Sequence, residues 1–323
     1  MDKKNKINYK LKRKIVQIIA AICTNAHVSG FITGKIYKGP IKQACVPGLN
    51  CYSCPGAVGG CPIGSLQAVI SDIKYKFSFY VVGFLVLIGT IFGRLICGWV
   101  CPFGLVQELL YKIPIPKKDI FKNVKFLKYL KYIILAVFVI ILPMFWVNDI
   151  GVGSPTFCKY ICPAGTLEAG IPLVLLNEGL RSSIGFIYKW KLSILIITII
   201  LSIITFRPFC RFICPLGAIY GLFNPISLIQ LDVDKNKCIK CKKCTRTCKL
   251  GVEAYKTPNS PECIRCAECI YECPTNALKF KVKTKDENME NNIGKDSDDR
   301  GINSRGIDLK GIKAKEIDIK KIF

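Results

Sequence analysis

Two short stretches near the C-terminus, CIKCKKCTRTC at residues 238–248 and CIRCAECIYECP at residues 263–274, contain eight of the 19 cysteines of this chain. Each stretch has the spacing C-x2-C-x2-C-x3-C. Three thiolates on one tight loop can bind three irons of a [4Fe-4S] cube, but the same loop is too short to reach the fourth iron. Where two such stretches occur together, each supplies the fourth thiolate of the other cluster. The spacing therefore predicts two [4Fe-4S] clusters.

This rule assigns the ligands of both clusters. One cluster is expected on Cys238, Cys241, Cys244 and Cys273, and the other on Cys263, Cys266, Cys269 and Cys248. Pro274 follows the last cysteine as the pattern asks, whereas Lys249 stands where proline usually follows the first stretch. Zinc sites favour two C-x2-C pairs and often include histidine, which this segment lacks. Disulfides are disfavoured because thiols on one tight loop are better placed to share a metal.

The composition indicates a membrane protein. The chain has 323 residues, of which 51% are hydrophobic, with a positive mean hydropathy and a formal net charge of +25. This combination fits apolar membrane spans with charge confined to loops and tails. A basic chain could also bind nucleic acid, but the Lys and Arg residues mostly flank apolar runs, so no nucleic-acid partner is expected. Clustered cysteines favour metal ligation in a reducing cell interior.

Four apolar runs predict a multi-pass protein of the cytoplasmic membrane. The expected spans are residues 15–32, 77–96, 130–147 and 188–206. Lys and Arg crowd the N-terminus and the segment after the second span, which places both termini in the cytoplasm by the positive-inside rule. Residues 171–187 are too polar and broken for an ordinary span, so a re-entrant or interfacial segment is expected there. The charged residues 283–323 are expected to form a disordered tail.

One motif, C-x3-C-P-x-G, occurs three times, each time just after an apolar run. The copies are CGWVCPFG at residues 97–104, CKYICPAG at 158–165 and CRFICPLG at 210–217. Side chains four residues apart share a helix face, so each copy offers half of the thiolates of a [4Fe-4S] cluster. On the expected topology, Cys97, Cys101, Cys210 and Cys214 form one set at the cytoplasmic face.

A glycine-rich loop adds thiols on the outer side. It contains Cys45, Cys51, Cys54 and Cys61, and simple alternation of spans places Cys158 and Cys162 on the same side. Glycines let backbone N–H groups approach an anionic cluster closely. Six thiols complete one further cluster and leave two over, and the choice of the four ligands stays open. A pair of disulfides in an oxidising exterior is the alternative for this loop.

A few other residues are expected to be structural. His27 is the only histidine, which excludes a haem with two histidine ligands, so a packed and hydrogen-bonded ring is favoured. Cys23 is expected to be a buried small hydrophobic residue. Glu108, Glu168 and Glu178 could exchange protons with a quinone, but solvated loop carboxylates are favoured.

Taken together, these motifs resemble the membrane polyferredoxins of the NapH/NosR type, also described as 4Fe-4S binding proteins. The resemblance covers roughly residues 10–280 and rests on C-x3-C-P motifs at span ends followed by a two-cluster unit. It implies electron transfer at the membrane between a quinol pool or cytoplasmic donor and a partner protein. The third C-x3-C-P copy and the Cys45–Cys61 loop exceed the pattern of the simplest members, so no particular respiratory pathway is carried over.

We therefore expect a mainly α-helical membrane protein. Residues 1–228 form a membrane domain of about four transmembrane helices with Cys-rich loops, and residues 229–282 form a small α+β ferredoxin-like domain with two [4Fe-4S] clusters. One or two further clusters are expected in the membrane domain. The expected partners are membrane lipid, redox proteins and a quinone. The chain is expected to transfer electrons within an oxidoreductase system, since no residues for acid-base or nucleophilic catalysis are visible. The alternatives are an iron-sulfur assembly or redox-sensing protein and a zinc-loaded membrane scaffold.

Overall fold

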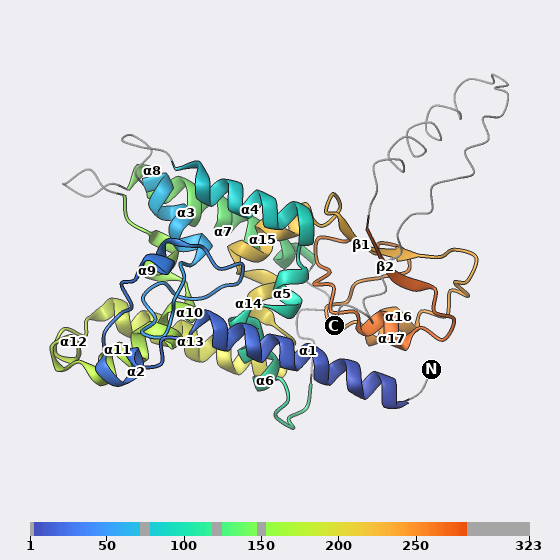
Figure 1. Ribbon diagram of the computed structural model, residues 1–323, viewed down its shortest axis with the longest axis horizontal. Coiled ribbons are helices and arrows are strands. Elements are labelled where there is room, and N and C mark those ends of the chain that lie inside the picture. Colours follow the sequence, from blue (N-terminus) through green and yellow to red (C-terminus); the bar gives the residue numbers. More distant parts are fainter. Residues whose placement is uncertain (1–2, 72–77, 118–124, 147–152, 283–323) are drawn as a thin grey trace, which may run out of the picture.

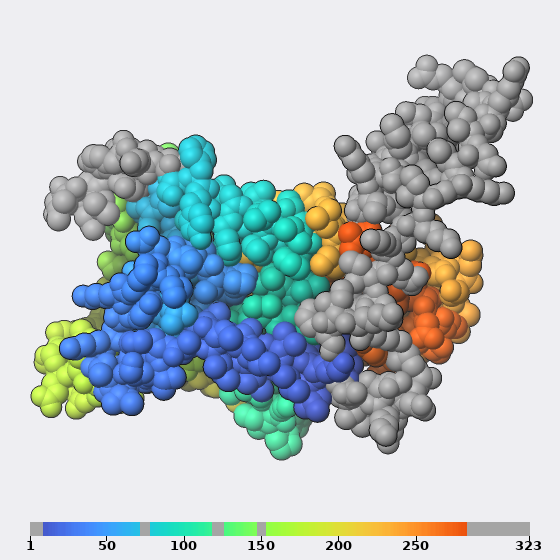
Figure 2. Space-filling model, viewed as in Figure 1, coloured from blue at the N-terminus to red at the C-terminus, as the bar shows by residue number. Residues whose placement is uncertain are grey.

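The computed structural model describes residues 3–71, 78–117, 125–146 and 153–282. Residues 3–228, here called the helical unit, form a bundle in which α1 (Lys3–Thr24), α4 (Phe79–Phe92) and α13 (Phe186–Ile204) run along the long axis of the molecule (Figure 1). Residues 229–282, the C-terminal unit, lie at one end of this bundle, beside the N-terminal half of α1 (Figure 2).

Two helices are long and apolar enough to cross a membrane, by length and composition. They span Phe126–Phe145, with 20 residues, and Phe186–Ile204, with 19 residues, and they match the expected spans at 130–147 and 188–206. The first of them is built from η2 (Lys125–Tyr129), α7 (Leu130–Ile134), the π-helical η3 (Leu135–Ile141) and α8 (Leu142–Phe145). Helix α4 is shorter, and the start of its expected span at residue 77 lies outside the described residues.

The expected span at residues 15–32 is not a single helix. Helix α1 begins at Lys3 and ends at Thr24, and the chain then turns into the short α2 (Gly30–Thr33). The side chains of Thr24 and Asn25 bond back to the carbonyl of Ala21, at 3.2 and 3.1 Å, and such local bonds compete with the helix ladder. Four complete transmembrane spans therefore remain a prediction.

Two of the long helices, α1 and α13, have apolar side chains on the outside and polar side chains among those they bury. On α1, Arg13 and Gln17 are buried, while the opposite face presents the exposed stripe Leu11, Ile15, Ile18, Ile19 and Ile22. On α13, Thr198 and Ser202 are buried, while Ile196, Ile197 and Ile200 are exposed. A helix on the surface of a water-soluble protein has the reverse pattern. The outward faces of α1 and α13 are therefore suited to hydrocarbon, and their inward faces make polar contacts.

Each C-x3-C-P-x-G copy folds into two helices that meet at the second cysteine. These pairs are α5 (Leu95–Trp99) with α6 (Pro102–Leu110), α9 (Thr156–Tyr160) with α10 (Pro163–Gly165), and α14 (Pro208–Phe212) with α15 (Pro215–Phe223). The two cysteines of a copy do not share one helical turn, as the i,i+4 spacing suggested, because proline forces the preceding residue into an extended conformation. Proline itself fits the first turn of the next helix.

Shorter elements complete the helical unit. They are η1 (Pro40–Gln43), α3 (Pro62–Ser71), the π-helical η4 (Thr166–Gly170), α11 (Ile171–Leu176) and α12 (Glu178–Ser182). Residues 171–187, expected to be re-entrant or interfacial, contain the two short helices α11 and α12, separated by an extended Asn177. Their depth in a membrane stays a prediction.

The C-terminal unit is a two-stranded antiparallel sheet with two short helices. Strand β1 (Ile229–Val233) pairs with β2 (Leu278–Val282), and α16 (Lys243–Thr247) and α17 (Glu268–Glu272) each follow a cysteine-rich loop. We call residues 238–244 the first cysteine loop and residues 263–269 the second. The unit thus has the small α+β character expected for residues 229–282.

Buried charged side chains join the second cysteine loop to the helical unit. Arg265 donates from Nη2 to the carbonyl oxygen of Asn224 at 2.7 Å. Next to this loop, Glu262 pairs with Arg94 at 3.4 Å and with Lys131 at 2.6 Å. The side chains of Arg94 and Lys131 are at most 1% exposed. Because breaking a buried pair costs about 3–5 kcal/mol, these contacts hold the two units in one arrangement.

Replacing Gly98 by alanine should loosen this join. A Cβ atom at position 98 would collide with the carbonyl oxygen of Ile264, which belongs to the backbone of the second cysteine loop. Overpacking of this kind costs about 1–3 kcal/mol, so thermal unfolding should begin at a lower temperature and trypsin should release the C-terminal unit faster. Gly83→Ala is the matched control, since a Cβ atom there meets nothing within 4 Å. Equal behaviour of the two variants would contradict this packing.

Candidate iron-sulfur sites

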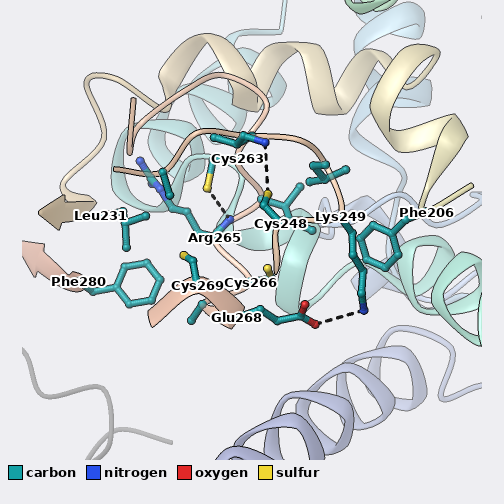
Figure 3. Close-up of a pocket in the computed structure, with 15 residues that line it drawn as sticks. Phe206, Leu231, Cys248, Lys249, Cys263, Arg265, Cys266, Glu268, Cys269 and Phe280 are labelled. Carbon is teal, nitrogen blue, oxygen red and sulfur yellow. Dashed lines mark hydrogen bonds and ion pairs between the residues drawn. The ribbon is translucent and has the colours of Figure 1, made fainter. Parts of the chain in front are cut away.

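The eight cysteines of the C-terminal unit surround two pockets. One pocket is lined by Cys248, Cys263, Cys266 and Cys269, and the other by Cys238, Cys241, Cys244 and Cys273. Figure 3 shows the first of these, where the sulfur atoms from the second cysteine loop and from Cys248 turn toward a common space. The structure thus brings together the same two groups of four that the spacing predicted. We call them the second and first C-terminal sets, respectively.

The two cysteine loops share one backbone conformation. Lys240 and Lys242 in the first loop have φ angles of 54° and 57°, and Arg265 and Ala267 in the second have 51° and 59°. A left-handed conformation costs a residue other than glycine about 1–2 kcal/mol. The loops adopt this conformation because the turns bring the three thiols of each loop to the same pocket.

A third group of thiols lies inside the helical unit. Cys97, Cys101, Cys210 and Cys214, the inner set, come from α5, α14 and the starts of α6 and α15, and they lie close enough to influence one another's ionisation. Gln107, 1% exposed, donates from Nε2 to Cys210 Sγ at 3.0 Å. The guanidinium group of Arg94 donates to the carbonyl of Cys210 at 3.0 Å, and that of Arg207 donates to the carbonyl of Cys97.

A fourth group lines a cavity of about 840 Å³. It consists of Cys51, Cys61, Cys158 and Cys162, here called the outer set. Gln67, which is fully buried, donates from Nε2 to Cys158 Sγ at 3.2 Å. Cys45 and Cys54 are buried but do not line this cavity. Of the six outer cysteines, the structure therefore gathers these four.

The inner and outer sets follow one plan. The N–H of Gly217 donates to Cys214 Sγ and that of Gly165 to Cys162 Sγ, each at 3.4 Å. Cys61 begins a further C-P-x-G stretch, CPIG at residues 61–64, and receives the N–H of Gly64 in the same way. Sequence reasoning missed this half-copy and also missed Gln67 and Gln107. The available signal was their shared position, six residues after the cysteine of a Cys-Pro pair.

The donor sets fit an iron-sulfur cluster better than a single metal ion. Among the described residues, no three Cys, His, Asp or Glu side chains are placed to hold one metal ion. The ligands of a [4Fe-4S] cube stand apart because each binds a different iron. Burial, and then the neighbouring Cys266, Cys263 and Cys248, raise the pKa of the Cys269 thiol well above its usual value. Such crowded thiolates need positive charge between them, which the irons of a cluster supply.

The comparisons with known proteins agree with this chemistry. A protein-family model described as a 4Fe-4S binding domain matches residues 77–121, 131–171 and 190–230. Each match contains one C-x3-C-P copy. The uncharacterised protein MJ0750 of Methanocaldococcus jannaschii is 30% identical over 208 residues, which are 61% of this chain and 75% of that protein. The ferredoxin-type protein NapH of Escherichia coli is 26% identical over 158 residues, 48% of this chain and 47% of NapH.

The regulatory protein NosR of Stutzerimonas stutzeri is 25% identical over 167 residues, 50% of this chain and 20% of NosR. The comparison with solved structures found no match. The chain belongs to the family of ferredoxin-type proteins of the NapH/NosR type. This polyferredoxin is accordingly an iron-sulfur protein that binds [4Fe-4S] clusters, and its class is electron transport.

In this polyferredoxin the loop that carries the outer thiols reaches the inner set, and the placement of the two sets at opposite membrane faces stays a prediction. Gly48, from the loop that carries the outer thiols, packs directly on Cys101 and Pro102. Tyr220 is fully buried, lies beside thiols of both sets, and donates from Oη to the carbonyl of Pro47 at 3.0 Å. The loop folds inward because its carbonyl oxygen at Pro47 accepts this hydrogen bond from Tyr220 within the bundle.

Solvated carboxylates are expected from the sequence at Glu108, Glu168 and Glu178. The expectation is wrong for Glu108, which is buried, and for Glu168, which is partly buried, and it agrees with the exposed Glu178. Glu168 is partly buried and accepts the backbone N–H of Cys51 at 2.6 Å, so it holds the outer loop in place. The expectation for His27 is confirmed, since its ring contacts the carbonyl of Pro55 at 3.0 Å. Cys23, expected to be buried, is exposed because α1 turns its polar face inward.

Glu108 is the centre of a buried ion cluster. It pairs with Arg13 at 2.9 Å, with Arg207 at 2.7 Å and with Lys14, and its side chain is 2% exposed. Burial opposes ionisation, but Arg207, Arg13 and Lys14 outweigh it and hold the pKa of Glu108 at about 2. Because this pKa lies below the ordinary value, the stabilisation is complete above about pH 4.5 and is lost as the pH falls through about 2.

Replacing Glu108 by glutamine should destabilise the polyferredoxin at pH 7. The change leaves Arg207 buried without its counter-charge and leaves Arg13 with only the more distant Glu268 at 4.0 Å, and breaking such a buried pair costs about 3–5 kcal/mol. The loss is measured as a lower thermal unfolding midpoint in anaerobic detergent solution. The exposed Glu178→Gln is the control and should leave the midpoint unchanged. A Glu108→Gln protein as stable as the wild type would show that the cluster contributes nothing.

Proposed function

We propose that this polyferredoxin is an integral membrane electron carrier with four [4Fe-4S] clusters. It would move electrons between a cytoplasmic donor or quinone pool and a partner at or across the membrane. Each cluster, when bound, accepts and releases one electron at a time. The four sets of four cysteines defined above are the proposed ligands. Cys45 and Cys54 are left without a cluster.

The observation that carries this proposal is that each set, or the loop that holds it, contacts the next. Cys244 of the first C-terminal set lies near enough to influence Cys269 of the second. Gly98, beside Cys97 of the inner set, packs on Ile264 and the backbone nitrogen of Cys266. Gly48, from the outer loop, packs on Cys101. Contiguity of this kind is what a relay requires, and a single structural site would not need it.

The residues around the inner and outer sets stabilise the negative charge that a cluster gains when it is reduced. Gln107 and Gln67 each donate a hydrogen bond to a ligand sulfur, and Arg94 and Arg207 place two fixed positive charges beside the inner set. Hydrogen bonds to sulfur and nearby positive charge raise the reduction potential of a cluster. The inner and outer sets are therefore suited to hold a cluster in its reduced state.

Membrane insertion is supported by the apolar outside of the bundle and by its two long apolar helices. We propose that both termini lie in the cytoplasm, as the density of Lys and Arg at the N-terminus favours. The C-terminal unit would then meet cytoplasmic partners, and the outer set would lie toward the far side.

Iron analysis tests the four-cluster assignment. Anaerobically purified protein should contain about 16 irons and about 16 acid-labile sulfides per chain, four for each set. Cys51→Ser should lower the iron content by about four, because it removes a ligand of the outer set. Cys54→Ser is the matched control from the same loop and should retain all the iron. Equal loss in both variants, or about eight irons in the wild type, would contradict the assignment.

Reversible reduction separates a relay from a redox sensor or a structural site. Electron paramagnetic resonance should detect signals from both helical sets after chemical reduction, and reoxidation should abolish them without loss of iron. Clusters in the helical unit that stay in one oxidation state throughout would contradict electron transfer through it.

A lysine on the outward face of α13 tests membrane insertion. Ile197 is 55% exposed, so Ile197→Lys would be harmless on a water-soluble surface. At the centre of a membrane helix it costs about 3 kcal/mol, and less protein should resist alkaline extraction of the membrane pellet. Ile239→Lys, in the C-terminal unit, is the control, because Ile239 is 66% exposed but outside the helices. Two equally extraction-resistant variants would argue against insertion of α13.

A further inference from the structure

The two cysteine loops present the same surface to different surroundings. Ile264 of the second loop is 1% exposed, whereas Ile239, at the same place in the first loop, is 66% exposed. The backbone of the second loop packs on Gly98, and the Arg265 guanidinium also bonds to the carbonyl of Phe92 at 2.9 Å. The second loop is therefore a docking surface already bound to protein, and the first loop offers the equivalent surface to the solvent.

Charge distinguishes the exposed loop from the docked one. Residues 235–246 contain six basic residues and no acidic one. Where the second loop has Ala267 and Glu268, the first has Lys242 and Lys243, and both lysines are exposed. Lys240 and Lys242 occupy left-handed positions that glycine or asparagine would fill at lower cost. Only Lys243, of these three lysines, pairs with a described carboxylate, Glu272 at 3.9 Å.

The result is an apolar centre within a positive rim. Ile239 is the exposed apolar residue, and the exposed basic residues Lys240, Lys242, Lys243 and Arg246 follow it in the loop and in α16. Arg246, in the last turn of α16, folds back and donates from Nη2 to the carbonyl of Cys241 at 3.2 Å. Protein interfaces have this plan of an apolar centre and a polar rim, and charge on the rim accelerates association with a partner of opposite sign. The surface also carries three ligands of the first C-terminal set, of which Cys241 is exposed.

We propose that this surface, residues 238–246, is the docking site for an acidic protein that carries a one-electron cofactor. The inference rests on the proposed electron-transfer function and adds the point of entry and the charge of the partner. A negatively charged membrane surface is the competing occupant. A protein is favoured because the equivalent face of the second loop is bound to protein in this same chain, and because Ile239 gives the patch an apolar centre.

Binding of an acidic flavodoxin tests the proposal. Full-length protein in discs of neutral phosphatidylcholine is titrated with fluorescently labelled flavodoxin at low and at moderate salt. The variant Lys240→Gln, Lys242→Gln, Lys243→Gln should bind at least about tenfold more weakly and lose most of the salt dependence. The control Lys35→Gln, Lys38→Gln, Lys112→Gln removes the same charge from exposed lysines of the helical unit and should bind like the wild type.

The outcomes separate the possibilities. Protection of Lys240 and Lys242 from acetylation by flavodoxin supports the docking site. Absence of saturable binding by the wild type at low salt, or equal binding by both triple variants, overturns it. Protection of the same lysines by phosphatidylglycerol in the disc, and not by flavodoxin, assigns the patch to lipid and also overturns it. Fluorescence detects binding whether or not electrons are transferred. A failure of the proposed function would therefore appear separately, in the iron analysis and in electron paramagnetic resonance.

Discussion

Thiolates that are buried together repel one another, and this constraint explains much of the structure. A cluster of irons offsets part of the repulsion, but the ligands still need donors and cations around them. The helical unit supplies these from inside. Gln67 and Gln107 each donate to a ligand sulfur, and Arg94 and Arg207 lie against the inner set. Polar groups that would be costly in an apolar core are therefore stabilised here by the sites they serve.

The polar inward face and apolar outward face of α1 follow from the same constraint. Because the bundle interior holds thiols, guanidinium groups and a buried carboxylate, the face of α1 that points inward carries Arg13 and Gln17. The apolar residues of α1 are then left outside, where hydrocarbon can cover them. The Cys-Pro steps end helices within the bundle, and the freed N–H groups of Gly165 and Gly217 turn to sulfur. The apolar outer face of α1 and the thiol-lined interior are therefore two aspects of one packing arrangement.

Local spacing made the C-terminal sets predictable from sequence. Three cysteines of each set lie on one tight loop, and the exchange of the fourth ligand follows from the geometry of a cube, so no distant contact had to be known. A helix near residues 188–206 was equally predictable, because this long apolar run is built as one helix, α13. In both cases residues close in the sequence determine the outcome.

Contacts between distant residues could not be read in this way. The outer set selects Cys51 and Cys61 over Cys45 and Cys54 through packing against α9 and α10, which lie about 100 residues later in the chain. Glu108 looked like a solvated loop carboxylate because its cations, Arg13 and Arg207, are far away in the sequence on either side. The end of α1 at Thr24 depends on two short polar side chains in an otherwise apolar run.

The two cysteine loops show how one local structure gains two roles. Their backbones match, including the left-handed turns before and after the middle cysteine, so cluster geometry alone would let either loop face either way. The side chains break the equivalence. Arg265 donates to the carbonyl oxygens of Phe92, at the end of α4, and of Asn224. The lysines of the first loop would bring unpaired positive charge into that buried contact. Charge therefore fixes which loop faces the bundle, and the same charge leaves the other loop facing outward, suited to an acidic partner.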